Sequence, residues 1–237
     1  MKTIKVIAAI GFLVSAVPGW SQAVISHGHV DLGVLYEEGT WDLHVHKETP
    51  PPDEEFAPGD AIIQLGPKAA LAGGVPNNAA ATGFFGAAGS PLWILPKAQD
   101  PDLPFFGIGA EEMSPDDWVG SLTLKLDEVR GPGNVFIWDV GAFGELEPKM
   151  SSRDGISASD VVGVEAGSHG HYFWAFSAPG DYEVSFSASG THKVDGAVAS
   201  DPVAYRFQVV PEPGVGWLLV VGGLCLSLRR GRSCTCG

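Results

Sequence analysis

Residues 169–189 read HGHYFWAFSAPGDYEVSFSAS, and this stretch decides the fold. Two segments in which large apolar and smaller side chains alternate flank the sequence APGD. Because successive side chains of a strand point to opposite faces, Tyr172, Trp174 and Phe176 would form one apolar face. Proline and glycine between the segments favour a turn. The stretch therefore predicts two β-strands that pack one face against a core.

The same pattern recurs on both sides of this stretch, with short apolar segments between clusters of glycine, proline, asparagine and aspartate. The strands expected from it are Val30 to Tyr36, Trp41 to His46, Ala61 to Leu65, Leu92 to Leu95, Ser121 to Leu126, Val135 to Val140, Asp160 to Val164, Tyr172 to Ser177, Tyr182 to Ser189 and Ala204 to Val210. No window outside the two ends has a helical period. Thr49 to Asp60 and Ala69 to Ser90 are expected to be surface loops. We predict an all-β chain: one β-sandwich domain, Ig-like or jelly-roll-like, over residues 24–209.

The amino-terminal end has the layout of a secretory signal peptide. Two lysines precede an apolar run from Val6 to Val17, and Ser21 and Ala23 are the small residues that a signal peptidase requires. We therefore expect residues 1–23 to be a signal helix, with cleavage after Ala23. A membrane anchor is the alternative, but no stop-transfer flank follows the run.

The carboxy-terminal end, residues 210–237, combines a Pro-Glu-Pro sequence, an apolar stretch from Val215 to Leu228 and three arginines. As a helix the stretch would be about 21 Å long, against a hydrocarbon core of about 30 Å. This order of features resembles the PEP-CTERM sorting signal of Gram-negative bacteria. The resemblance implies an exosortase partner, a transient membrane helix, and attachment at or release from the cell surface. An ordinary tail helix is the alternative, and both place the domain outside the inner membrane.

Removing the ends makes the remaining chain more acidic. Residues 24–210 contain nine Lys and Arg against 27 Asp and Glu, a formal charge of −18. A nucleic-acid partner is therefore not expected. Cys225, Cys234 and Cys236 all fall in the tail, so the domain has no disulfide and no thiolate ligand.

Six of the seven histidines occur as three His-x-His pairs, at residues 27–29, 44–46 and 169–171. Residues i and i+2 of a strand point to the same face, so each pair projects two imidazoles side by side. That arrangement suits a divalent transition metal, and imidazole with carboxylate does not choose among zinc, manganese and copper. For a single pair, a structural role is the alternative.

The first two pairs are related through a predicted hairpin. If Glu38 and Gly39 form a two-residue turn, the numbers of opposed residues add up to 77. Asp31 then faces His46, and Gly33 faces His44. We expect His29, Asp31, His44 and His46 to share one face of this hairpin, with Trp41, Leu43 and Val45 on the core face.

The spacing H-x-H-x-x-W-x-F-x-x-P-G-x-Y over residues 169–182 resembles the choice-of-anchor M domain surface proteins, which contain a repeat of actinobacterial wall-anchored proteins. Residues 28–31, 41–46, 93–96, 107–112 and 131–134 support the resemblance. Some such proteins are encoded beside metal-type ABC transporters, which implies metal capture at the surface. A metal-transport system and a surface polysaccharide are the partners considered.

The leading hypothesis is an exported, non-enzymatic surface domain that binds a divalent metal. Its expected ligands are His29, Asp31, His44, His46, His169 and His171, with Glu111 as a further carboxylate. A structural or adhesive surface protein without a metal is the second hypothesis. A metalloenzyme is the third, but no nucleophile elbow, His-Glu-x-x-His helix, phosphate loop or catalytic cysteine is present.

Overall fold

The computed structural model of the chain describes residues 22–211 and is mostly β-structure, as the sequence predicts. The strands are β1 (Ala23–Ile25), β2 (Gly28–Glu37), β3 (Thr40–Lys47), β4 (Glu54–Phe56), β5 (Ala61–Leu65), β6 (Trp93–Leu95), β7 (Pro104–Gly109), β8 (Leu122–Arg130), β9 (Val135–Val140), β10 (Leu146–Ser151), β11 (Val161–Val164), β12 (His169–His171), β13 (Phe173–Phe176), β14 (Gly180–His192), β15 (Gly196–Ala199) and β16 (Val203–Val209). The helical elements are α1 (Ala79–Phe85) and three 3-10 turns, η1 (Pro58–Asp60), η2 (Pro67–Ala69) and η3 (Pro115–Asp117). Over these residues, no helix has the length and apolar character needed to cross a membrane.

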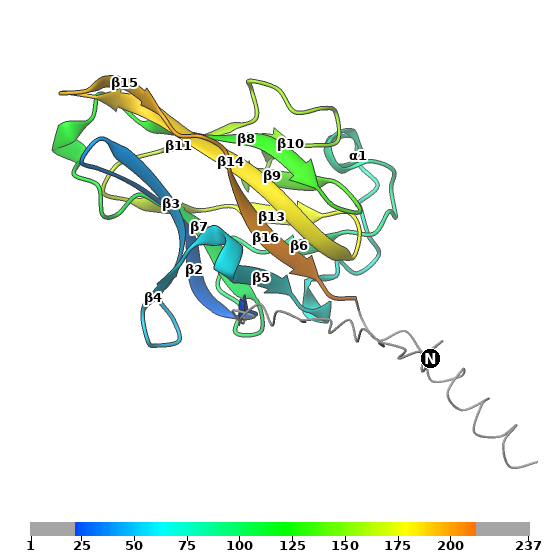
Figure 1. Cartoon of the computed structure of the whole chain (residues 1–237). Helices are drawn as coiled ribbons and strands as arrows, with labels where there is room; N and C mark the ends of the chain where they lie inside the picture. Colours follow the sequence, from blue (N-terminus) through cyan, green and yellow to red (C-terminus); the bar gives the residue numbers. More distant parts are fainter. Residues whose placement is uncertain (1–21, 212–237) are drawn as a thin grey trace, which may run out of the picture.

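The strands form three sheets. Seven strands make the largest, in the order β1-β5-β16-β14-β8-β11, with β15 added beside the long strand β14. A four-stranded sheet has the order β10-β9-β13-β6, and a five-stranded sheet has the order β12-β7-β2-β3-β4. Figure 1 shows the β2–β3 hairpin and β4 at one side of the molecule and α1 at the other.

One core joins the three sheets at Trp174 of β13, which is fully buried. Its ring lies 4.9 Å from that of Phe106 of β7, 5.8 Å from Phe186 of β14 and 5.9 Å from Phe207 of β16, measured between ring centroids. The apolar face predicted around Trp174 is thus the face that packs against the core. Burying large aromatic side chains of this kind is the main stabilising contribution in residues 22–211, which contain no cysteine.

The β2–β3 hairpin has the predicted register. Glu37 pairs with Thr40 across the two-residue turn, Asp31 pairs with His46, and Gly33 pairs with His44. Glu38 and Gly39 both have positive φ, as a type I′ turn requires. Leu43 and Val45 are buried on the core face, which confirms the predicted division of the hairpin.

The stretch from Ala69 to Ser90, expected to be a surface loop, instead contains α1 and covers the outer face of the four-stranded sheet. Val75, Ala81 and Phe85 are buried there against Phe136 and Trp138 of β9. The side chain of Asn78 accepts a hydrogen bond from the amide of Ala81 and caps the helix. The expectation failed because seven residues are too few to show a helical period.

Thr49 to Asp60 was likewise expected to be a loop, and it contains β4 and η1. Six strands were not predicted: β1, β4, β7, β10, β12 and β15. The omission of β7 matters most, because this strand lies between β12 and β2. The predicted signal helix of residues 1–23 and the predicted sorting tail of residues 210–237 lie almost wholly outside the described residues. β1 begins at Ala23, the residue at the predicted cleavage point.

Candidate metal centre

The five-stranded sheet brings the second and third histidine pairs and His29 to one face. Its register aligns His171, Gly107, Asp31 and His46 in one row across β12, β7, β2 and β3. The adjacent row contains His169, Gly109, Gly33 and His44. We call this surface the histidine face, defined by His29, Asp31, His44, His46, His169 and His171. The alternate residues of β2 and β7, such as Leu32 and Phe106, are buried in the core.

Two glycines make room for these side chains. A Cβ atom on Gly107 would lie 2.2 Å from Oδ1 of Asp31 and 2.9 Å from Cε1 of His171. A Cβ atom on Gly33 would lie 2.2 Å from Nε2 of His44. Glycine in a strand interior often marks a place where another group approaches closely. Here the approaching groups are the imidazoles and the carboxylate of the histidine face.

The first cluster consists of His29, Asp31, His169 and His171. Nε2 of His29 lies 3.0 Å from Nε2 of His171 and 3.5 Å from Oδ2 of Asp31. Ligand atoms of the histidines His29, His169 and His171 lie within 4.8 Å of one another. Two ligands on one ion with bonds of about 2.1 Å are about 3.0 to 3.4 Å apart. The cluster therefore has the spacing of a metal centre.

Carboxylates orient two of these rings. Nδ1 of His29 lies 2.6 Å from Oε2 of Glu48, and Nδ1 of His169 contacts Oε1 of Glu111. A carboxylate that accepts from Nδ1 leaves Nε2 of a neutral ring unprotonated and available to a metal. The hydrogen bond that His169 donates to Glu111 is also the main reason that the pKa of His169 is raised. Burial, followed by the neighbouring histidines, lowers the pKa of His171 to about 4, so that its ring is neutral near pH 7.

Asp31 is the most unusual member of the cluster. Its side chain is 2 % exposed, and neither carboxylate oxygen has a hydrogen-bond partner. Burial raises the pKa of Asp31 to about 6, although His29 and His169 lower it. An unpartnered buried polar group costs about 1–3 kcal/mol, and more when it is charged. The carboxylate thus lies beside the imidazoles of His29 and His169 without a hydrogen bond to either.

A second group lies beside the first and consists of His44, His46 and Glu112, with ligand atoms within 4.8 Å of one another. Nε2 of His44 is 3.7 Å from Oε1 of Glu112. Nε2 of His46 is 2.8 Å from Oδ1 of Asp53 in the Thr49–Asp60 segment. Burial lowers the pKa of His46, but the hydrogen bond and charge of Asp53 outweigh burial and raise it overall.

All seven residues expected as ligands lie on or beside the histidine face, divided between two groups. The first pair does not act as a unit, because His29 joins the cluster whereas His27 is exposed and belongs to none of the groups. The sequence reasoning missed Glu48 and Glu112. Glu48 could have been found, since the hairpin rule that pairs Asp31 with His46 also places Glu48 opposite His29. Glu112 had no such signal, because it follows the unpredicted strand β7.

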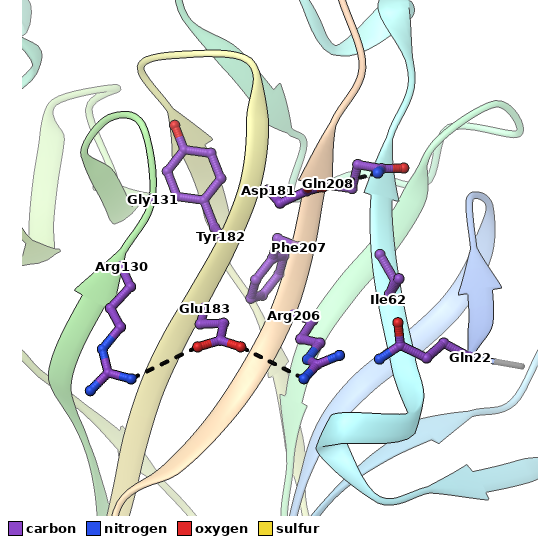
Figure 2. A pocket seen from close by; sticks show the side chains of 10 residues that line it. All are labelled: Gln22, Ile62, Arg130, Gly131, Asp181, Tyr182, Glu183, Arg206, Phe207 and Gln208. Carbon is purple, nitrogen blue, oxygen red and sulfur yellow. Dashed lines mark hydrogen bonds and ion pairs between the residues drawn. The ribbon is translucent and has the colours of Figure 1, made fainter. Parts of the chain in front are cut away.

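A pocket of about 550 Å³ lies elsewhere, on the outer face of the seven-stranded sheet. Figure 2 shows Glu183 between Arg130 and Arg206, with its oxygens 3.9 Å and 3.7 Å from their nitrogens. Nε2 of Gln208 donates to Asp181 over 2.9 Å. The charged side chains that line this pocket already have hydrogen-bond or ion-pair partners. A bound ligand would therefore satisfy fewer unpaired polar atoms here than on the histidine face.

No family model matches the chain, and no curated protein or solved structure matches it either.

Proposed function

We propose that this chain is an exported, surface-associated, non-enzymatic β-domain protein that binds a divalent transition-metal ion through His29, Asp31, His169 and His171. The observation that carries the proposal is the buried carboxylate of Asp31, which lies beside the imidazoles of His29 and His169 and has no hydrogen-bond partner. A cation there would relieve the cost of burying that charge. Glu48 and Glu111 would hold two of the rings in the ligating orientation.

Zinc, manganese and copper are the candidate ions. Three imidazoles with one carboxylate suit each of them, and the affinity of such a site follows the general order that places copper above zinc and manganese. The surrounding domain favours any cation, because residues 24–210 have a formal charge of −18. Metal capture for a transport system is the role that agrees with the resemblance to choice-of-anchor M domain proteins.

Equilibrium dialysis followed by elemental analysis tests the proposal. The full chain is stripped with a chelator and dialysed against zinc, manganese or copper. We expect at least one equivalent of one ion to be retained. His29→Asn should abolish binding at the first cluster, while His27→Asn, which changes an exposed histidine two residues away, should not. Substoichiometric binding of all three ions would contradict the proposal and favour a structural or adhesive role.

We also propose that residues 1–23 direct export and that residues 210–237 act as a PEP-CTERM tail handled by an exosortase. The supporting features are the lysines and apolar run at one end and the Pro-Glu-Pro, apolar stretch and arginines at the other. Fractionation of cells tests this directly. Deleting residues 210–237 should shift the protein from the membrane and surface fractions to the medium or periplasm.

The finer fold, a single β-sandwich of the Ig-like or jelly-roll-like kind, is proposed on the basis of the shared core around Trp174. The hydroxyl of Tyr182 donates to the carbonyl oxygen of Ala178 over 2.8 Å. A tyrosine bonded to the backbone a few residues upstream at the start of a strand is found in Ig-like domains, where it is called a tyrosine corner. An experimental structure would test the assignment, and failure of the sheets to pack face to face would contradict it.

A further inference from the structure

We propose that the histidine face has a second metal site, formed by His44, His46 and Glu112, so that the domain binds two divalent ions. This inference uses side chains of the same face as the proposed function, but none of the four ligands assigned to the first ion. The two ions would be held side by side, the first by β2 and β12 and the second by β3 and the segment that follows β7.

His44 provides the first argument. It is 5 % exposed, and neither ring nitrogen has a hydrogen-bond partner. A neutral imidazole has one donor and one acceptor, so a buried ring without partners leaves both unsatisfied. Its Nε2 atom lies over Gly33, where a side chain would fill the space. A metal ion would supply the missing partner of the unprotonated nitrogen, so the buried ring of His44 is suited to be a metal ligand.

The neighbours of His44 provide the second argument. His46 lies two residues along β3 and points to the same face, and Glu112 supplies a carboxylate oxygen 3.7 Å from Nε2 of His44. Asp53 accepts a hydrogen bond from Nε2 of His46, which leaves Nδ1 of the neutral ring unprotonated. The arrangement repeats that of the first cluster, in which Glu48 and Glu111 orient His29 and His169.

The group formed by His44, His46 and Glu112 can be reached by an ion from solvent. A narrow pocket opens onto the group and is lined by Asp31, Gly33, Val34, His44, His46, Gly109, Glu111 and Glu112. The side chain of Glu112 is 40 % exposed, so an ion can reach the buried ring of His44 along it. Asp31 and Glu111 line the same pocket, so two carboxylates of the first cluster lie close to the second group. Those charges would offset part of the repulsion between two cations held close together.

The test is the number of zinc ions bound by the full chain, measured by isothermal titration calorimetry and by elemental analysis after dialysis. We expect two ions for the unchanged chain. Glu112→Gln and His44→Asn should each reduce this to one and lower the affinity for the lost ion at least about tenfold. His171→Asn should also leave one ion, bound at the second site.

Glu55→Gln is the matched control. Glu55 is the cross-strand partner of His46 on β4 and is exposed, and its substitution removes the same charge near the same histidine. It should leave both ions bound. Melting curves of each metal-free variant would establish that a lost ion does not reflect a lost fold. Glu112→Gln changes an exposed side chain, so it is the variant with the smallest expected effect on folding.

The outcomes separate this inference from the proposed function. One ion that is lost in His171→Asn and kept in Glu112→Gln and His44→Asn overturns the second site and leaves the first. One ion that is lost in Glu112→Gln and His44→Asn and kept in His171→Asn supports the second site and contradicts the first. Binding of no ion overturns both, and two ions that survive Glu112→Gln and His44→Asn overturn the second site.

Discussion

The histidine face and the outer face of the seven-stranded sheet both carry polar side chains in rows across neighbouring strands. They differ in whether those side chains have partners and contact water. On the seven-stranded sheet, each of three adjacent strands contributes a long side chain, and Arg130, Glu183 and Arg206 pair laterally while staying in contact with water. On the histidine face, Asp31, His44 and His171 pack over Gly107 and Gly33, where they are shielded from water and keep polar atoms without partners. Among the described residues, ten buried side-chain polar atoms lack a partner, and five of them belong to Asp31, His44 and His171. The two faces differ in that the seven-stranded sheet pairs its charged side chains with one another, whereas the histidine face gathers unpaired polar atoms over glycines, an arrangement that would suit a bound cation.

Of the substitutions that test this difference, Gly107→Ala should have the largest effect, on zinc binding at the first cluster. The new methyl group would meet Oδ1 of Asp31 at 2.2 Å and Cε1 of His171 at 2.9 Å, which must push apart two ligands of the first ion. Gly107 does not have the positive φ at which alanine would be strained, so the backbone tolerates the change. We expect the first ion to be lost, or its affinity to fall at least about a hundredfold, in a zinc titration.

Gly163→Ala is the control for that variant. Gly163 lies in β11 at the edge of the seven-stranded sheet, and a Cβ atom there would meet nothing closer than Cβ of Ser121 at 4.0 Å. Its zinc binding should equal that of the unchanged chain. Full zinc affinity in Gly107→Ala would show that the space above Gly107 is not needed to form the site.

Asp31→Asn should separate stability from binding. Above its pKa of about 6 the buried carboxylate is charged and has no hydrogen-bond partner, whereas an amide can donate to Nε2 of His29. We expect the metal-free variant to have a free energy of unfolding about 1–3 kcal/mol higher than the unchanged metal-free chain, measured by urea unfolding at neutral pH. Zinc should then stabilise the variant less than the unchanged chain. A metal-free variant that is less stable than the original would contradict the view of Asp31 as an unsatisfied charge.

Two buried tyrosines test whether an isolated unsatisfied atom needs a ligand. The hydroxyl of Tyr182 is satisfied by Ala178, whereas that of Tyr205 has no partner. Tyr182→Phe should lower the free energy of unfolding by about 1 kcal/mol, and Tyr205→Phe should leave it unchanged or raise it slightly, by urea unfolding. Equal losses in the two variants would mean that Tyr205 has a partner in solution.

The same tyrosines predict a dependence on alkaline pH. Burial raises the pKa of Tyr182 to about 12 and that of Tyr205 well above its ordinary value of 10.0. Between pH 10 and 12 the unfolded chain therefore releases protons that the folded chain retains, so stability falls as the pH rises. Tyr205→Phe should make that fall shallower, and a slope equal to that of the unchanged chain would contradict the assignment.

Glu183→Gln should have the smallest effect. Its partners Arg130 and Arg206 have side chains that are 68 % and 42 % exposed, and exposed ion pairs contribute little to stability. We expect the melting temperature to change by less than about 2 °C and zinc binding to stay the same. A large loss of stability would mean that the lateral pairing of this face matters as much as the core.

The sequence predicted the parts of the site that depend on a short turn. The two-residue loop at Glu38 and Gly39 determines which residues of β2 and β3 oppose each other, so the shared face of Asp31 and His46 followed directly. The position of the third pair could not be predicted, because it depends on β7, whose glycines at 107 and 109 have low strand propensity. The reason for glycine at these two positions is that side chains of the neighbouring strands pack over them, which only the folded structure shows. The helix α1 had a local signal in Asn78 and the alanines after it, but its packing against β9 depends on contacts far along the chain.

The contact between His29 and His171 joins positions 142 residues apart in the chain. A chain that is still emerging from a translocation channel contains the first histidine long before the last one is available, and an unfolded chain holds no preformed site. The proposed first ion could therefore be bound only where folding is completed. For an exported protein, the metal pool of that compartment would decide which ion is taken, even where another ion has the higher intrinsic affinity.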